Sequence, residues 1–166
     1  MPGDACDLHI ALLAEMDHSI QTLTPARVAM IERSVVQELL EARPQIARAM
    51  WSTQLVDEGT LRAWIVSMGR RSSVARVAHL MCELYVRARN IGLVHGNELE
   101  FPMTQIVLAD ALGMTPVHIN RVLRKLREQG VMELKEKSLL LLDPVKLAEI
   151  AGFDENYLHR RLRRAA

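Results

Sequence analysis

The chain has 166 residues, enough for one domain or two small ones, and its residues are 49% apolar but only 4% aromatic, which favours an aliphatic helical interior. A formal net charge of +1 gives no global nucleic-acid signal, so any such binding has to rest on local clusters of cations. Two widely separated cysteines, Cys6 and Cys82, indicate neither a disulfide framework nor a zinc site, and no apolar run or signal peptide suggests a membrane or secreted protein. We therefore expect a cytoplasmic protein.

The N-terminal region begins with Pro2-Gly3-Asp4, which is typical of a turn. Residues 8–16 are compatible with either a helix or a strand. Residues 19–23 and 27–31 are predicted to be short strands, and residues 32–43 an amphipathic helix. Two short strands cannot close an all-β domain by themselves.

A long helix is predicted to begin at Pro44 and to continue to about Met68. Its apolar positions recur at mixed three- and four-residue spacing, as in a coiled-coil seam about 25 residues and ~37 Å long. Gly59 interrupts the pattern at a cost of roughly 0.5–1 kcal/mol relative to Ala. The seam positions are Ile46, Met50, Thr53, Val56 or Asp57, Leu61, Trp64 and Met68. A monomer could bury this helix in its core, but we favour dimerisation because too little chain remains to cover it.

Gly69-Arg70-Arg71-Ser72 is predicted to be a hinge, with Ser72 as the N-cap of a helix over residues 73–90. Arg70 and Arg71 could contact phosphates or only solvate the hinge. One broad face of the helix is apolar; Cys82 lies on it as a small buried hydrophobe, and His79 is interpreted as a scaffold residue. A loop over 92–97 and a short strand over 98–101 follow.

Residues 103–130 have the pattern of two helices joined by a tight turn. Thr104 precedes an apolar series that ends at Gly113, in a position where positive φ is favoured. Thr115 then supplies an N-cap oxygen, and Pro116 occupies the first helical position, where its missing N–H costs nothing. The second helix ends at Gly130. The apolar positions are Ile106, Val107, Ala109 and Leu112 in the first helix and Ile119, Val122, Leu123 and Leu126 in the second.

The opposite face of the second helix suggests a function. At 100° per residue it consists of Val117, Arg121, Arg124 and Glu128, flanked by His118, Asn120 and Lys125. Arginine can pair with guanine and asparagine with adenine, while further cations meet phosphates, so this face suits the major groove of DNA. Four Lys or Arg against two Asp or Glu give residues 103–130 a local excess of only +2. The alternative is a solvated face on an ordinary helical hairpin.

Two short β-like runs, 131–135 and 138–142, directly follow this second helix, as in the wing of a winged helix-turn-helix. Asp143-Pro144 then caps a short helix over 145–150, which Gly152 ends. Asp154 caps another helix that ends in Arg160-Arg161-Leu162-Arg163-Arg164. These arginines could bind DNA, but a solvated tail at a helix C-terminus is the favoured interpretation.

Residues 104–143 resemble the DNA-binding domain of the CRP/FNR superfamily, above all in the segment Leu-Ala-Asp-Ala-Leu-Gly-Met-Thr-Pro-Val-His-Ile-Asn-Arg-Val-Leu-Arg-Lys-Leu over 108–126. The resemblance implies a mainly α (α+β) protein. It divides the chain into a partial cyclic-nucleotide-binding-like β-roll with its following helix (1–43), a dimerisation helix (44–69) and a winged helix-turn-helix domain (70–166). The upstream part of the β-roll is then expected to be missing from this sequence.

The same resemblance implies a transcriptional regulator that binds a palindromic site on double-stranded DNA as a homodimer, through a recognition helix at about 115–129. Arg121 matches the superfamily's recognition arginine, and Asn120 is expected to read an adenine. Val117 replaces a glutamate that reads cytosine in many members, so it is expected to contact a thymine methyl instead. The expected contacts to the DNA backbone are Thr104, Gln105, Thr115, His118, Arg124 and Lys125. The expected dimer contacts are Ile46, Met50, Thr53, Asp57, Leu61, Trp64 and Met68.

Sensing is expected to differ from that of the cyclic-AMP-binding members. Those use a Gly-Glu pair and an Arg-Ser pair, whose Arg neutralises the cyclic phosphate. The matching stretches here are Cys6-Asp7-Leu8 and Asp17-His18-Ser19, with no arginine at the phosphate position, so we do not expect cyclic AMP to bind. Two cysteines also cannot supply the four thiolates of a typical iron–sulfur cluster.

No cofactor, metal or enzymatic activity is expected. Asp17-His18-Ser19 is not a catalytic triad, because triads are assembled in space and no oxyanion-hole motif accompanies these residues. RNA polymerase is a further candidate partner, and no membrane is expected to be one. Two alternatives stay open: a protein-interaction module that forms inhibitory heterodimers with full-length relatives, and a constitutive DNA binder that senses nothing.

Overall fold

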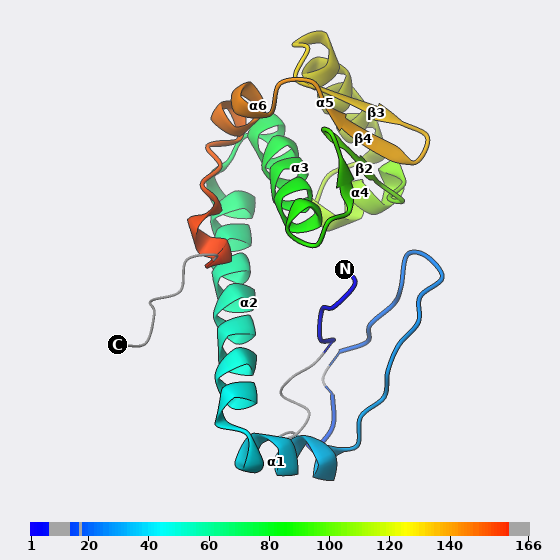
Figure 1. Cartoon of the computed structure of the whole chain (residues 1–166). Coiled ribbons are helices and arrows are strands. Elements are labelled where there is room, and N and C mark those ends of the chain that lie inside the picture. Colours follow the sequence, from blue (N-terminus) through cyan, green and yellow to red (C-terminus); the bar gives the residue numbers. More distant parts are fainter. Residues whose placement is uncertain (7–13, 17, 160–166) are drawn as a thin grey trace.

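The computed structural model describes residues 1–6, 14–16 and 18–159, so the predictions for Asp7, Leu8, Asp17 and 160–164 lie outside the described residues. One long helix organises the molecule: α2 joins α1 at one end to a compact helical domain at the other (Figure 1). α1 spans Arg33–Ala42 and α2 spans Pro44–Arg70, with Pro44 at the start of the helix. The predicted long helix and the amphipathic helix before it are therefore confirmed.

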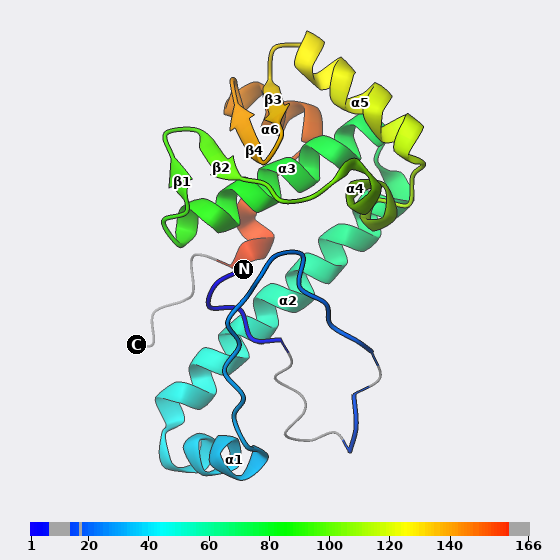
Figure 2. The same cartoon turned by 90° about the vertical axis from the view of Figure 1, so that its right-hand side faces the viewer.

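The strands predicted over 19–23 and 27–31 are wrong, because the structure has no strand in either range. The described residues 14–16 and 18–35 are all exposed, and Met30 retains 93% of its surface. A strand needs a neighbouring backbone for its ladder and an apolar surface on which to place alternate side chains. The described part of the chain offers neither to this segment, which instead runs as an extended loop (Figure 2).

The domain beyond α2 is built on α3 (Ser73–Asn90), whose predicted bounds are confirmed. Packed around it are α4 (Gln105–Ala111), α5 (Pro116–Glu128) and α6 (Pro144–Ala151), followed by the 3-10 helix η2 (Glu155–Leu158). The buried core is aliphatic, as the composition predicted. Its fully enclosed side chains include Val77, Met81, Leu108, Leu112, Ile119, Leu126, Val131, Leu139 and Leu147.

A four-stranded antiparallel sheet lies beside the helices in the order β1-β2-β4-β3. The strands are β1 (Val94–His95), β2 (Glu98–Glu100), β3 (Met132–Lys135) and β4 (Ser138–Leu141). The predicted strand pair after α5 is thus confirmed. β1 lies in the stretch predicted to be a loop, since a two-residue strand is too short to show a sequence period.

Candidate nucleic-acid interface

The α4–α5 pair has the predicted helix ends. The Oγ1 of Thr104 accepts a hydrogen bond from the Val107 N–H at 3.2 Å, and the Oγ1 of Thr115 accepts one from the His118 N–H at 3.2 Å. Gly113 between the two helices has φ +60°, a conformation that costs glycine little. These local bonds fix where α5 begins and therefore which residues its first turns present.

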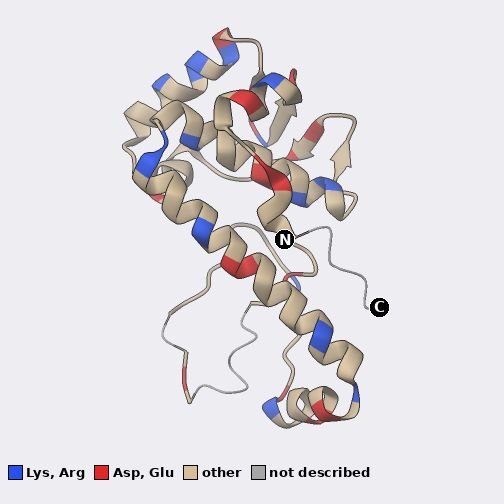
Figure 3. Ribbon diagram, turned by 90° about the vertical axis from the view of Figure 1, so that its left-hand side faces the viewer, with Lys and Arg blue, Asp and Glu red and all other residues tan. Residues whose placement is uncertain are grey.

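α5 has one buried and one exposed face. Its inner face packs on the core through Ile119, Val122, Leu123 and Leu126. Its outer face exposes Arg121, Arg124 and Lys125, and Val117 keeps 72% of its surface accessible. Lys and Arg recur along this helix at the end of the molecule opposite α1 (Figure 3). An exposed basic helix anchored only by its inner face has the shape and charge that the major groove accepts.

The outward side chains differ in how they are held. The Asn120 amide nitrogen donates to the Gln105 Oε1 at 3.1 Å, which joins the N-terminal turns of α4 and α5. Arg124 forms an ion pair with Glu128 at 3.7 Å. Arg121 makes no hydrogen bond or ion pair with any residue in the described part of the chain. Its five donors are therefore available to a ligand.

The remaining predicted backbone contacts also lie on this side of the domain. Thr104, Gln105 and Thr115 are exposed and His118 is half-buried. The two threonine hydroxyls accept capping bonds, and each still has a proton to donate to a phosphate oxygen. The structure thus places the nine predicted DNA-contacting residues on α4, α5 and their caps. Those residues are Thr104, Gln105, Thr115, Val117, His118, Asn120, Arg121, Arg124 and Lys125.

The hinge arginine Arg71 is engaged inside the molecule. Its Nε donates to the carbonyl of Ala151 at 3.1 Å and one Nη to that of Gly152 at 3.4 Å, at the C-terminal end of α6. A cation there suits the helix dipole. Arg76 similarly joins the ends of α2 and α4, by donating to the carbonyls of Met68 and Leu112, each at 3.0 Å. The sequence predicts neither role, because the carbonyls that Arg71 and Arg76 bind are 8 to 81 residues away along the chain.

The predicted dimer contacts on α2 differ in how exposed they are. Leu61 is 64% exposed, and Ile46, Thr53, Asp57 and Met68 are also exposed. Trp64 instead lies half-buried against its own domain. Large apolar side chains that the seam omitted are exposed as well. They are Trp51, Leu55, Ile65 and Val66.

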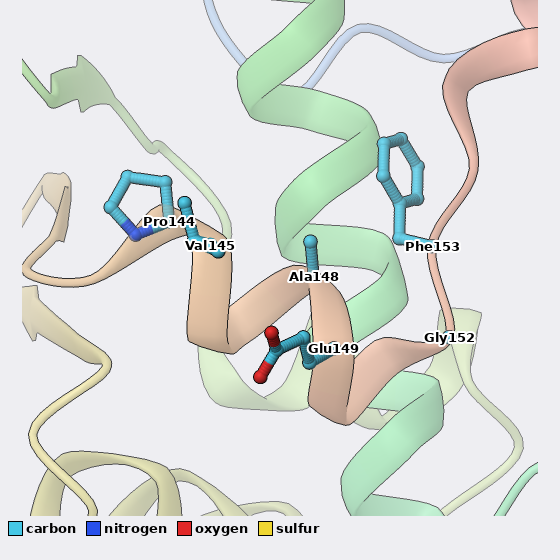
Figure 4. Close-up of a pocket in the computed structure, with 6 residues that line it drawn as sticks. All are labelled: Pro144, Val145, Ala148, Glu149, Gly152 and Phe153. Carbon is cyan, nitrogen blue, oxygen red and sulfur yellow. The ribbon is translucent and has the colours of Figure 1, made fainter.

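A groove outside the α4–α5 pair is also present among the described residues. α6 and the following segment line a shallow groove of about 510 Å³ whose single ionisable side chain is Glu149 (Figure 4). Within the same described ranges there is no group of three or more His, Cys, Asp or Glu suited to a metal, and no helix long and apolar enough to cross a membrane.

Comparison with known proteins agrees with the geometry of the α4–α5 pair and its wing. Residues 75–150 match the Crp-like helix-turn-helix domain. These residues therefore form a helix-turn-helix domain like that of Crp, and the chain resembles the CRP/FNR transcriptional regulators. Among its CRP/FNR relatives, the nitrogen fixation regulation protein FixK of Azorhizobium caulinodans is 25% identical over 142 residues, which are 86% of this chain and 56% of the relative. The transcriptional activator protein FnrL of Cereibacter sphaeroides is 23% identical over 84% of this chain and 58% of the relative.

Solved structures of the family share the fold. FixK2 from Bradyrhizobium japonicum superposes with a TM-score of 0.63 at 22% identity, covering 72% of this chain and 59% of FixK2. A CooA variant from Carboxydothermus hydrogenoformans gives a TM-score of 0.59 over 70% of this chain and 53% of CooA. The chain therefore spans only a little over half the length of these relatives.

Proposed function

We propose that this chain is a CRP/FNR transcriptional regulator that binds a palindromic DNA site as a dimer, with α5 in the major groove. The observation behind this proposal is the outer face of α5, where Arg121 is exposed and unpaired among the described residues while the inner face is fully packed. Arg121 reads a guanine, Asn120 an adenine and Val117 a thymine methyl. The polar and charged residues around them contact phosphates and so set register and affinity.

Dimerisation through α2 follows from its exposed apolar side chains. Leu61, Ile65 and Trp51 are each more than 60% exposed on a helix that ends beside the winged domain. Burying such side chains against a second α2 would contribute roughly 1.5–3 kcal/mol for each one fully removed from water. A two-fold axis along α2 then relates two α5 helices, which matches the symmetry of a palindromic site.

The test is a salt-graded titration of the full chain against a random duplex library, with its mass in solution measured in parallel. Selection of a two-fold symmetric site by a dimer supports the proposal, and affinity should fall as salt rises because phosphate contacts release counterions. A dimer that binds DNA only weakly and without sequence preference contradicts it.

A second candidate function is a protein-interaction module that pairs with longer relatives and prevents their DNA binding. The observation that favours it is the extended segment 18–32, whose Ile20, Val28, Met30 and Ile31 are exposed and have no sheet to join among the described residues. Co-purification with a full-length CRP/FNR protein, together with loss of that protein's operator binding, supports this function over the first.

A further inference from the structure

A buried carboxylate joins α2, α3 and the C-terminal segment. Glu83, in the middle of α3, is only 2% exposed. The Trp64 indole N–H on α2 donates to its Oε1 at 3.3 Å, and the Tyr157 hydroxyl on η2 donates to its Oε2 at 2.7 Å. Arg87 on the next turn of α3 lies 3.9 Å from Oε1 and also forms an ion pair with Asp4 at 2.8 Å. We call Glu83, Trp64, Tyr157 and Arg87 the Glu83 cluster.

Tyr157 is held firmly in this position. Its ring stacks on the His79 ring with centroids 5.7 Å apart, and the edge of Phe153 packs against both rings. Burial and the adjacent Glu83 raise the pKa of Tyr157, so its hydroxyl stays protonated and donates throughout the physiological range. Its main chain lies so close to Gly59 of α2 that a Cβ there would overlap the Tyr157 carbonyl oxygen.

The covalent connection between α2 and the winged domain is short and has no helical structure. Only Arg71 and Ser72 separate α2 from α3, and both have extended backbone angles (ψ 144° and 159°). Two such residues permit many relative orientations of the helices they join. Contacts beyond this connection must therefore select one orientation. Those contacts lie between Gly59 and Met68, positions about 14 Å apart along α2 at 1.5 Å per residue.

We propose that the Glu83 cluster fixes the angle between α2 and the winged domain and thereby sets the spacing of the two half-sites that a dimer recognises. This inference rests on the proposed function. With a lever of about 13 Å, the radius of gyration of a 100-residue domain, a rotation of about 15° moves α5 by about 3.4 Å, the rise of one base pair. A loosened cluster would therefore let the dimer accept sites that differ by a base pair in spacing.

The test uses duplexes that contain two identical half-sites separated by spacers differing by single base pairs. Tyr157→Phe keeps the ring stack and removes only the hydroxyl that binds Glu83. We expect the affinity ratio between the best spacer and its neighbours to fall by about threefold to tenfold, which is the order of the net contribution of one hydrogen bond. Binding to an isolated half-site should stay within about twofold of the wild type, because α5 is untouched.

A matched control exists within the same domain. Tyr85 is also buried, and its hydroxyl donates to Asn97 at 3.1 Å without contacting α2 or η2. Tyr85→Phe should lose comparable stability and keep the wild-type spacer ratio. Trp64→Phe removes the other donor to Glu83 and serves as the second test variant if Tyr157→Phe does not fold.

Each outcome decides the inference. A lower affinity ratio between the best spacer and its neighbours in Tyr157→Phe or Trp64→Phe, with the ratio of Tyr85→Phe unchanged, supports it. A Tyr157→Phe or Trp64→Phe variant that folds, binds the half-site and keeps the wild-type ratio overturns it. An equal fall of the ratio in Tyr85→Phe also overturns it. A wild-type chain that reads half-sites but has no spacer preference overturns this inference and leaves base reading intact, whereas a chain that binds no DNA overturns the proposed function as well.

Discussion

Replacing Arg121 with alanine tests the base-reading role of α5 most directly. The side chain is exposed and forms no bond with the described part of the chain, and alanine is at least as good a helix former as arginine. The free energy of unfolding should therefore change by no more than about 0.5 kcal/mol. Loss of a bidentate contact to guanine should weaken binding to the selected site by roughly 1–3 kcal/mol, or about 5-fold to 140-fold.

The assay compares dissociation constants, by fluorescence anisotropy at fixed salt, for the selected duplex and for variants with each other base at every position of the half-site. Arg121→Ala should lose discrimination at one position of the half-site and keep it at the others. Lys125→Ala is the matched control, because that residue is exposed on the same helix and is expected to contact phosphate. It should weaken binding to all duplexes equally and reduce the salt slope by about one.

Equal weakening of every duplex by Arg121→Ala would refute the base-reading role, since it would show that this arginine also contacts only phosphate. Unchanged affinity together with an unchanged melting temperature would show that α5 does not face DNA through this side at all.

Three further predictions concern the scaffold. Gly59→Ala should destabilise the protein by about 1–3 kcal/mol in urea unfolding, because the new methyl would overlap the backbone of η2, whereas Gly69→Ala, with open space around it, should be neutral or stabilising. Burial, and secondly the charge of Arg71, lower the pKa of His79 to about 4, so the stability that depends on neutral His79 is fully present above pH 6.5. Relative to His79→Phe, the free energy of unfolding should fall by about 2–3 kcal/mol between pH 6.5 and 4. An identical pH profile in the two proteins would contradict this. Burial raises the pKa of Cys82 to about 12, so an alkylating reagent at pH 8 should modify only the exposed Cys6 until denaturant is added, and two modified thiols in the native protein would show that Cys82 is accessible.

Several features of the site could be predicted from the sequence because they depend on residues a few positions apart. The caps Thr104 and Thr115 each bond to an N–H three residues ahead, and Gly113 needs only its own backbone freedom. The inner and outer faces of α5 follow from the helical period, so exposure of Arg121 was predictable once the helix was placed. The wing was predictable for the same reason, since its two strands are neighbours in sequence.

The strands predicted over 19–23 and 27–31 failed because local propensity cannot supply a partner strand. In the sequence, Gly59 suggests only a weak point in a long helix. The structure shows that a glycine at this position lets η2 approach α2 closely, because a Cβ there would overlap the Tyr157 carbonyl oxygen. The exposed face of α2 was predicted only in part. Trp64 was expected to contact a second copy of the helix, but its indole N–H donates to Glu83 of the same chain, a contact that the helical period does not reveal.

Glu83 shows most clearly what only the tertiary structure decided. In the sequence it is one polar residue near the apolar face of a helix, with no motif around it. Its two donors, Trp64 and Tyr157, are 19 and 74 residues away, and only the packing of α2 and η2 on α3 brings them to one carboxylate. The sequence by itself determined α5 and its exposed basic face, because capping and periodicity are local. The orientation of that helix relative to α2 depends on contacts between distant residues, which only the folded chain brings together.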